Sequence, residues 1–292
     1  MPERNRKIDR CALCGERTVL EVSHIIPKFV PDWMKKNGGT PFLTSLANPQ
    51  KREQDGDKTT LLCRKCEQKF CVWETKFANE IFYPFHKHEK VICSYDGWLH
   101  LFVVSLAWRF GVYVKEKDER VLSALEVWRK CLLDEAIEDD IYDHHIFFIL
   151  KNENDPSLPD GYDMYNFTHY DEAIALDSNE KTHQGWLYMF IHIPGFIFCS
   201  CIDPIIQEDW FGTLILPKGK LDSNAPRSIP DHVKVQYISR IERYGGIRYS
   251  PKRMEQITKS FRKNEQQVKQ SLGYKMGLRD LSRAALKKGK KG

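Results

Sequence analysis

The sequence lacks both an apolar leader and an apolar segment of membrane-spanning length. Residues 1–7 carry charge and no apolar run follows them, so we expect no secretory signal. The longest apolar stretch, residues 99–114, contains His100 and Arg109 and is shorter than the roughly 18–20 residues that cross a bilayer. We therefore expect a buried helix there, a cytoplasmic protein and no membrane partner.

The sequence shows no internal repeat, and it is not short of apolar residues. Hydrophobic residues make up 41% of the chain, which excludes a globally disordered protein and allows a buried core. The chain has 292 residues, enough for two domains of ordinary size. The net charge of +5 is unevenly distributed, because residues 251–292 hold 13 Lys and Arg against 3 Asp and Glu. This basic segment could attract a phosphate backbone or could be a solvated tail.

The nine cysteines do not indicate a disulfide framework. Their number is odd, and no leader directs the chain to an oxidising compartment. In a reducing cytoplasm, paired cysteines more often bind metal than form disulfides.

The pattern of apolar residues predicts an α+β fold in two domains. We expect an N-terminal module over residues 1–95 and a mixed domain of helices and antiparallel sheet over residues 96–292. In the second domain, residues 98–114 and 118–136 show helical patterns, the latter with Val121, Leu122, Leu125, Trp128 and Leu132 as its stripe. Short apolar runs predict strands at 146–150, 186–193, 196–202 and 210–216, and Pro194-Gly195 predicts a tight turn. Residues 251–288 return to helical spacing.

Two Cys-x-x-Cys pairs predict a structural zinc site. Cys11 and Cys14 form the first pair, and Cys63 and Cys66 form the second. Two such knuckles supply four sulfur ligands for tetrahedral Zn²⁺. The 48 residues between the pairs exceed the roughly 15–20 of a simple zinc ribbon. We therefore expect the insert to contain residues beyond those of a zinc scaffold. The alternative is four buried or redox-active cysteines.

His24 is the first candidate catalytic residue. It follows a predicted strand over residues 18–22 and precedes Pro27, a position that presents an imidazole rigidly. A neutral imidazole can accept a proton from water near pH 7. A single histidine among apolar residues is more often structural. Here, however, the flanking cysteine pairs favour the catalytic interpretation.

Glu67, directly after Cys66, is the second candidate. Residues 66–82 predict one helix with Cys66, Phe70, Trp73, Phe77 and Ile81 as its apolar stripe. A carboxylate at the start of this helix could ligate Mg²⁺ or a similar ion, or it could simply complement the helix dipole. Glu74 lies about 10.5 Å further along the helix, too far to share one ion, so we expect a supporting role for it.

The arrangement of Cys-x-x-Cys, Ser23-His24-Ile25-Ile26-Pro27 and Leu62-Cys63-x-x-Cys66 resembles the HNH endonucleases, over about residues 8–85. The resemblance implies a ββα-metal module, His24 as general base and a catalytic Mg²⁺ or Mn²⁺. Ser23 and Glu67 stand where many members carry metal-binding residues, and Lys58 replaces the usual asparagine. Asn48, Asp55 and Asp57 are the nearest substitutes, and we assign Ser23, Asp57 and Glu67 to the catalytic ion.

The continuation Phe70-Cys71-Val72-Trp73-Glu74 resembles a glutamate-containing variant found in uncharacterised bacterial HNH-like proteins of antiviral defence type. The resemblance implies cleavage of nucleic acid, of DNA rather than RNA, under control of a sensor or regulatory protein. A homo-oligomer would suit double-strand cleavage. The alternative is a non-catalytic, zinc-stapled module that binds nucleic acid or protein. A redox enzyme is disfavoured, because neither cysteine pair begins a βαβ pattern.

Overall fold

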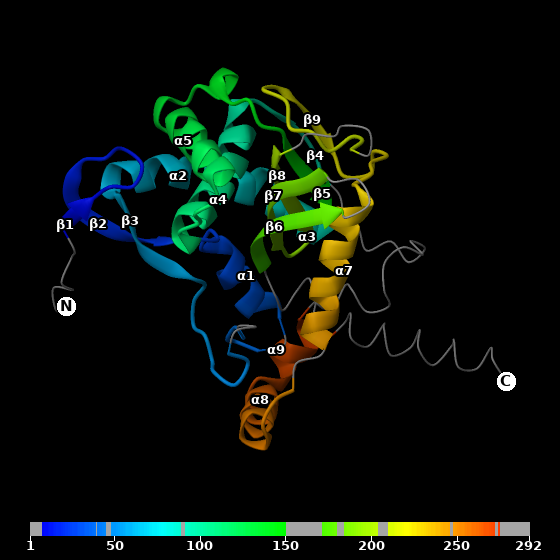
Figure 1. The fold of residues 1–292 in the computed structure, drawn as a ribbon. Helices are drawn as coiled ribbons and strands as arrows, with labels where there is room; N and C mark the ends of the chain where they lie inside the picture. The colour runs from blue at the N-terminus through cyan, green and yellow to red at the C-terminus, as the bar shows by residue number, and fades with distance from the viewer. Residues whose placement is uncertain are drawn as a thin grey trace.

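The computed structural model describes residues 8–38, 40–44, 48–88, 91–149, 171–179, 184–203, 210–245, 248–271 and 274. Helices and antiparallel sheets alternate along this part of the chain, so the predicted α+β class is confirmed at that level. The N-terminal sheet lies at one end of the molecule. Helices α4 (Gly97–Val114) and α5 (Glu119–Asp134) separate it from a four-stranded sheet (Figure 1).

The N-terminal module is a three-stranded antiparallel sheet followed by a helix. The strands lie in the order β1-β2-β3, and α2 follows β3 directly; their bounds are β1 (Ile8–Arg10), β2 (Arg17–His24), β3 (Lys58–Cys63) and α2 (Arg64–Lys76). The predicted strand is longer than expected, because His24 still pairs with Lys58. His24 is therefore the last residue of β2 rather than a residue beyond it.

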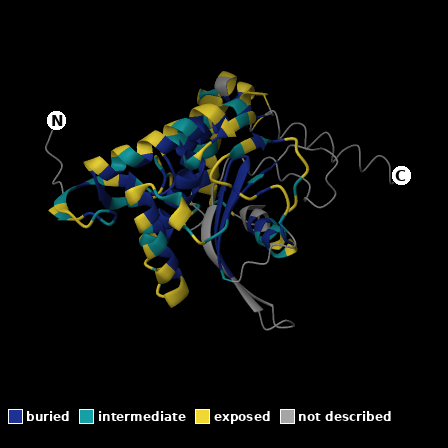
Figure 2. Cartoon of the chain, turned by 90° about the horizontal axis from the view of Figure 1, so that it is seen from above, coloured by how far each residue is buried: buried dark blue, intermediate teal, exposed yellow. Residues whose placement is uncertain are grey.

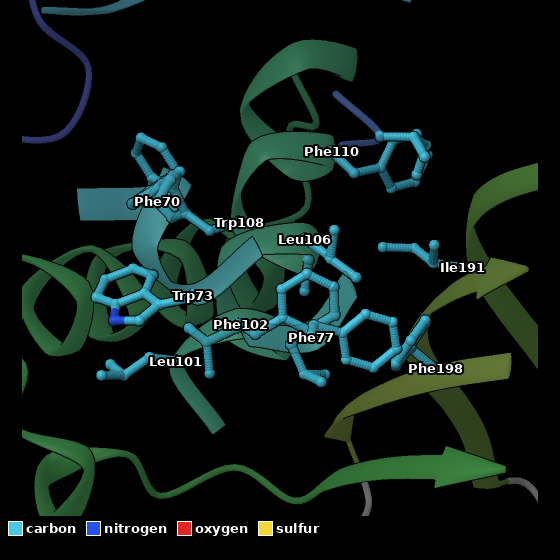
Figure 3. Packing of buried hydrophobic residues seen from close by; sticks show 14 of the residues in the cluster. Phe70, Trp73, Phe77, Leu101, Phe102, Leu106, Trp108, Phe110, Ile191 and Phe198 are labelled. Atoms are coloured by element: carbon cyan, nitrogen blue, oxygen red, sulfur yellow. The ribbon is translucent and has the colours of Figure 1, made fainter. Parts of the chain in front are cut away.

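The predicted helix over residues 66–82 is present, but it starts earlier and changes from an α-helix to a π-helix along its length. It begins at Arg64, turns π-helical over Phe77–Phe82 and continues as α3 (Tyr83–His88). All five residues of the predicted apolar stripe are buried. Phe77 stacks on Phe102 of α4 with 4.2 Å between ring centroids, which joins the N-terminal module to the central helix (Figure 3).

Helix α4 is the predicted buried helix. By length and composition it is the one helix of the described residues that could cross a membrane, but 78% of it is buried within the protein. Asp96 caps its start by accepting a hydrogen bond from the Trp98 amide. In α5 the predicted stripe holds except at Leu122, which is 47% exposed, because it lies off the face that Val121 and Leu125 share.

The second sheet is antiparallel, in the order β5-β8-β7-β6. Its strands are β5 (His144–Phe148), β6 (Asp171–Asn179), β7 (Gln184–Ile193) and β8 (Phe196–Asp203). The predicted hairpin is confirmed, since Pro194 and Gly195 alone separate β7 from β8. Gly195 has φ +81°, and a Cβ atom there would lie 2.7 Å from the Phe85 ring, so glycine is required on both grounds.

Both faces of this sheet are covered by helices. Along β7, Met189 and Ile191 belong to the core cluster of α4 and α5, whereas Tyr188 and Phe190 belong to a second cluster with Val233 of α7 (Asp231–Gly245). This alternation is the period of two that a strand imposes. Residues 187–193 of β7, and most residues of β5 and β8, are accordingly buried (Figure 2).

The predicted strand at residues 210–216 is wrong. Those residues form only isolated bridges, Phe211 with Ser228 and Leu214 with His145. Gly212 has φ +67°, which breaks the extended conformation, and Pro217 ends the stretch. The strand in this region is β9 (Gly219–Asp222), which pairs with β4 (Ile92–Tyr95).

The C-terminal segment is helical as predicted over its described part. It forms α8 (Pro251–Lys263) and α9 (Glu265–Gln270), and the basic residues from 275 onward lie outside the described residues. Arg253 of α8 is buried, donates a hydrogen bond to Thr44 at 3.1 Å and lies over the Phe42 ring. Helix α8 thus packs against the insert that separates β2 from β3. That insert also contains α1 (Phe29–Asn37).

One hydrophobic cluster extends across the predicted domain boundary at residues 95 and 96. It includes Leu13 and Phe70 from the N-terminal side and Phe102, Trp128 and Phe198 from the C-terminal side. Figure 3 shows side chains of α2, α4 and the second sheet meeting in this cluster. The two predicted regions therefore share a core.

Candidate metal centre

The four predicted cysteines come together. Cys11 and Cys14 lie in the turn after β1, Cys63 ends β3, and Cys66 lies in the first turn of α2. Their sulfur atoms all lie within 4.8 Å of one another, and the Cys14 and Cys63 sulfurs are 3.9 Å apart. Zn–S bonds of about 2.3 Å place tetrahedral sulfurs about 3.8 Å apart, so the cluster has the dimensions of a zinc site. All four are free thiols, and 3.9 Å is far longer than a disulfide bond.

Backbone geometry shapes the first knuckle. The Gly15 amide donates to the Cys11 carbonyl at 2.8 Å, and Gly15 adopts φ +74°, which a glycine accepts without strain. The Cys63 amide donates to the Cys11 sulfur at 3.3 Å. Burial acts to raise the pKa of the Cys11 thiol, but the backbone donors at Cys14 and Cys63 outweigh it and lower that pKa. A lowered pKa favours the thiolate, the form that binds zinc, at Cys11, whereas burial raises the pKa of the Cys14 and Cys66 thiols.

His24 lies beside a carboxylate that comes from the insert. Its Nε2 atom is 3.0 Å from Oδ1 of Asp55, and Asp55 also pairs with Lys58 at 3.0 Å. Burial acts to raise the pKa of Asp55, but His24 and Lys58 outweigh it and lower that pKa to about 2. Nε2 is buried and its contact with Asp55 is poorly aligned, and the side chain of His24 as a whole is 17% exposed.

Glu67 lies beside Ser23. The Ser23 hydroxyl, buried near the end of β2, donates a short hydrogen bond to Oε1 of Glu67 in the first turn of α2. Burial raises the pKa of the Glu67 carboxyl, and Ser23 and Arg109 oppose this shift without cancelling it. Two of the three residues assigned to a catalytic ion are therefore neighbours, and together they offer a hydroxyl and a carboxylate group.

Asp57, the third residue assigned to that ion, has a different environment. Asp57 is exposed, and its backbone carbonyl accepts a hydrogen bond from the Ile25 amide at 2.9 Å. Partial desolvation by the surrounding chain, followed by the charge of Glu53, raises the pKa of its carboxyl. In the part of the chain that the structure describes, no compact cluster of three donors includes Asp57, Glu67 or His24. The assignment of Asp57 stays a prediction.

The sequence reasoning missed Arg109. This residue of α4 is only 2% exposed, and it donates to the His24 carbonyl at 2.9 Å and pairs with Glu74 at 2.7 Å. Its guanidinium also lies 5.2 Å from the centre of the Phe70 ring. Glu74 therefore has the supporting role expected of it. The sequence did contain a signal for this role, because Arg109 lies within a mostly apolar helix and a buried charge needs a partner.

Asp55 was named only as a substitute for the missing asparagine, and its contact with His24 was not foreseen. The insert that carries it has no periodic pattern, so nothing in the sequence predicts which of its polar residues reaches the end of β2. Comparisons with protein-family models, with curated proteins and with solved structures gave no match. The chemistry of this region must therefore be argued from its own residues.

Proposed function

We propose that β2, β3 and α2 form a metal-dependent endonuclease of the HNH type that hydrolyses phosphodiester bonds, with DNA as the preferred substrate. The observation that carries this proposal is the pairing of His24 with Asp55 at the end of β2. The hydrogen-bonded Ser23 and Glu67 lie on the same strand end and the facing helix. Ser23 and His24 lie on β2 and Glu67 lies on α2, the helix that also carries Cys66 of the four-cysteine cluster. Asp55 comes from the insert that precedes β3.

His24 acts as the general base in this proposal. A carboxylate beside Nε2 favours the tautomer with the proton on that nitrogen, which leaves Nδ1 to accept a proton from the attacking water. The poor alignment of the His24–Asp55 contact does not argue against this role, since catalytic hydrogen bonds often tighten only when substrate binds. The hydrogen bond from Arg109 to the His24 carbonyl fixes the backbone at this residue.

Glu67, with Ser23 and Asp57, would hold a catalytic Mg²⁺ or Mn²⁺. Carboxylate and hydroxyl oxygens are hard ligands of the kind these ions prefer, which the Ser23–Glu67 pair supplies. When bound, the ion would stabilise negative charge on the phosphate and on the leaving oxygen.

The biological context of this activity is also a proposal. The resemblance to defence-type HNH proteins suggests a cytoplasmic effector of antiviral defence, switched on by a sensor protein. The regions beyond residue 95 would then select the substrate or bind that partner.

One observation favours a second candidate, a zinc-stapled module that binds nucleic acid or protein without cleaving it. The Glu67 carboxyl is partly buried, its pKa is raised, and one of its oxygens already accepts a hydrogen bond from Ser23. A protonated, hydrogen-bonded Glu67 would be a structural residue rather than a metal ligand.

Cleavage assays with the full chain separate the two candidates. Purified protein is incubated with Mg²⁺ or Mn²⁺ and plasmid, linear duplex or single-stranded nucleic acid, alone and with the products of neighbouring genes. We expect cleavage by the wild type, and a loss of at least about 100-fold in the His24→Ala variant. Zinc content should stay unchanged in that variant, and its melting temperature should fall by no more than a few degrees, because it loses the contact with Asp55.

The matched control is His88→Ala, which removes an exposed histidine of α3 and should cleave like the wild type. Cleavage retained by His24→Ala would remove His24 as the base. If the wild type leaves every substrate intact under all these conditions, the binding module is the correct interpretation.

A further inference from the structure

Three metal-binding side chains meet outside the N-terminal module. They are His100 in α4, Asp140 just after the 3₁₀ turn Ile137–Asp139, and His144, the first residue of β5. Both imidazoles direct Nε2 at the same carboxylate oxygen, Oδ2 of Asp140, at 3.0 Å from His100 and 2.8 Å from His144. The ligand atoms all lie within 4.8 Å of one another.

The cluster is buried and lacks a basic partner. The side chains of Asp140 and His144 have no exposed area, and that of His100 is 8% exposed. Among the described residues, no lysine or arginine forms an ion pair with Asp140. Besides the two imidazoles on Oδ2, the Tyr142 amide donates to Oδ1 of Asp140 at 3.0 Å, and none of these donors carries a fixed positive charge. An ionised carboxylate is costly to bury unless its charge is compensated. A divalent ion would compensate this one without requiring either imidazole to be charged.

The surroundings of His144 fit those of a metal ligand. Its Nδ1 atom lies 2.8 Å from the hydroxyl oxygen of Ser200 on β8, and its ring is within 5.6 Å of the Trp128 ring, centre to centre. A ligating imidazole is usually held by a hydrogen bond from its second nitrogen, which fixes both tautomer and orientation. The adjacent His145 points to the opposite face of β5, where its ring stacks on Trp210 at 3.8 Å.

We propose that His100, Asp140 and His144 bind a divalent first-row transition-metal ion, with zinc as the expected occupant. Two imidazole nitrogens and one carboxylate oxygen form a donor set that suits zinc and its neighbours in the series. The ion would tie α4 to β5 and to the turn that follows α5. Because the site is enclosed, its role is to stabilise the fold rather than to act on a substrate. This proposal does not depend on the proposed nuclease activity.

The test is the metal content and ligand shell of the full chain. Protein purified without chelator is saturated with zinc, dialysed and analysed by elemental mass spectrometry and X-ray absorption at the zinc edge. The wild-type shell should contain nitrogen and oxygen together with sulfur. In Glu67→Gln protein, which lacks the charged ligand of the proposed catalytic ion, we expect two ions per chain. Asp140→Asn and His144→Ala should each lose one ion and the nitrogen and oxygen scattering. The matched control His145→Ala should keep both ions.

A wild-type shell of sulfur alone, or wild-type protein without metal, would overturn the proposal and show a hydrogen-bonded carboxylate–imidazole cluster instead. This decision needs only the wild-type protein, so it stands even if a variant fails to fold. Scattering from imidazole nitrogen in the wild type supports the site whatever the four cysteines hold.

Discussion

At the scale of single residues, two carboxylates near the end of β2 have opposite electrostatic environments. Two basic partners lower the pKa of Asp55, whereas burial raises the pKa of Glu67. Pairs of carboxyl groups whose pKa values are driven apart often have different roles in one site. Here Asp55 is suited to orient His24. Glu67 is suited either to ligate the catalytic ion or, in its protonated form, to a structural role.

The substitution Glu67→Gln tests that role. Glutamine keeps the oxygen that accepts from Ser23 and removes a charge that burial disfavours, so the melting temperature should change by no more than a few degrees. If Glu67 binds the catalytic ion, cleavage should fall by about 100-fold or more, because the ion loses its charged ligand. Thermal melting and plasmid cleavage measure the two effects. Cleavage at the wild-type rate would exclude Glu67 as a ligand.

Asp55 predicts a dependence of stability on pH. Its pKa in the folded protein, about 2, is below the ordinary value of 3.8, so its contribution is fully present above about pH 4 and is lost as pH falls towards 2. We expect Asp55→Asn to be less stable than the wild type at pH 6 and equally stable near pH 2. Denaturant unfolding of both proteins across this range measures the difference. A difference that does not shrink with acid would contradict the ion pairs with His24 and Lys58.

At the scale of elements, helix α4 contacts the candidate site through Arg109, which binds the His24 carbonyl and Glu74. Its hydrophobic character is evident in the sequence, and a buried helix over residues 98–114 could be predicted from it. The contacts of Arg109 with the His24 carbonyl and with Glu74 could not be predicted from the sequence. They depend on how α4 packs against α2 and β2. Local patterns specify helices and strands, whereas pairings across the core depend on tertiary packing. The failed strand at 210–216 shows the same limit, since an apolar run alone does not fix a strand.

The substitution Arg109→Met tests the support that α4 gives. It leaves Glu74 without its partner and the His24 carbonyl without its donor, which should cost about 3 kcal/mol of unfolding free energy. Cleavage should also fall, since the backbone at His24 is no longer fixed. The control Arg120→Met removes an exposed arginine that pairs with Asp118 and Asp203, and it should have little effect on stability. Equal effects of the two substitutions on stability would contradict a structural role for Arg109.

At the scale of the whole molecule, short-range patterns predict the order of elements, whereas packing across the predicted boundary at residue 95 is seen only in the structure. The four-cysteine cluster, the helix after it and the β7–β8 hairpin follow from short-range patterns. The boundary at residue 95 was drawn where the pattern changes, yet the hydrophobic cluster continues across it from Leu13 to Leu221. A boundary in sequence pattern need not be a boundary in packing, because cooperative folding depends on which apolar surfaces meet.

This shared core predicts that loss of zinc destabilises the whole chain rather than its N-terminal third. Zinc binding is coupled to folding of the knuckles, and the knuckles pack into the same cluster as α4 and the second sheet. We expect one calorimetric unfolding transition in the wild type, and Cys63→Ser should move it down by about 10 °C or more without splitting it. The control Cys71→Ser changes an exposed cysteine outside the cluster and should melt like the wild type. Two separate transitions, with only one sensitive to Cys63, would instead show that the regions before and after residue 95 unfold independently.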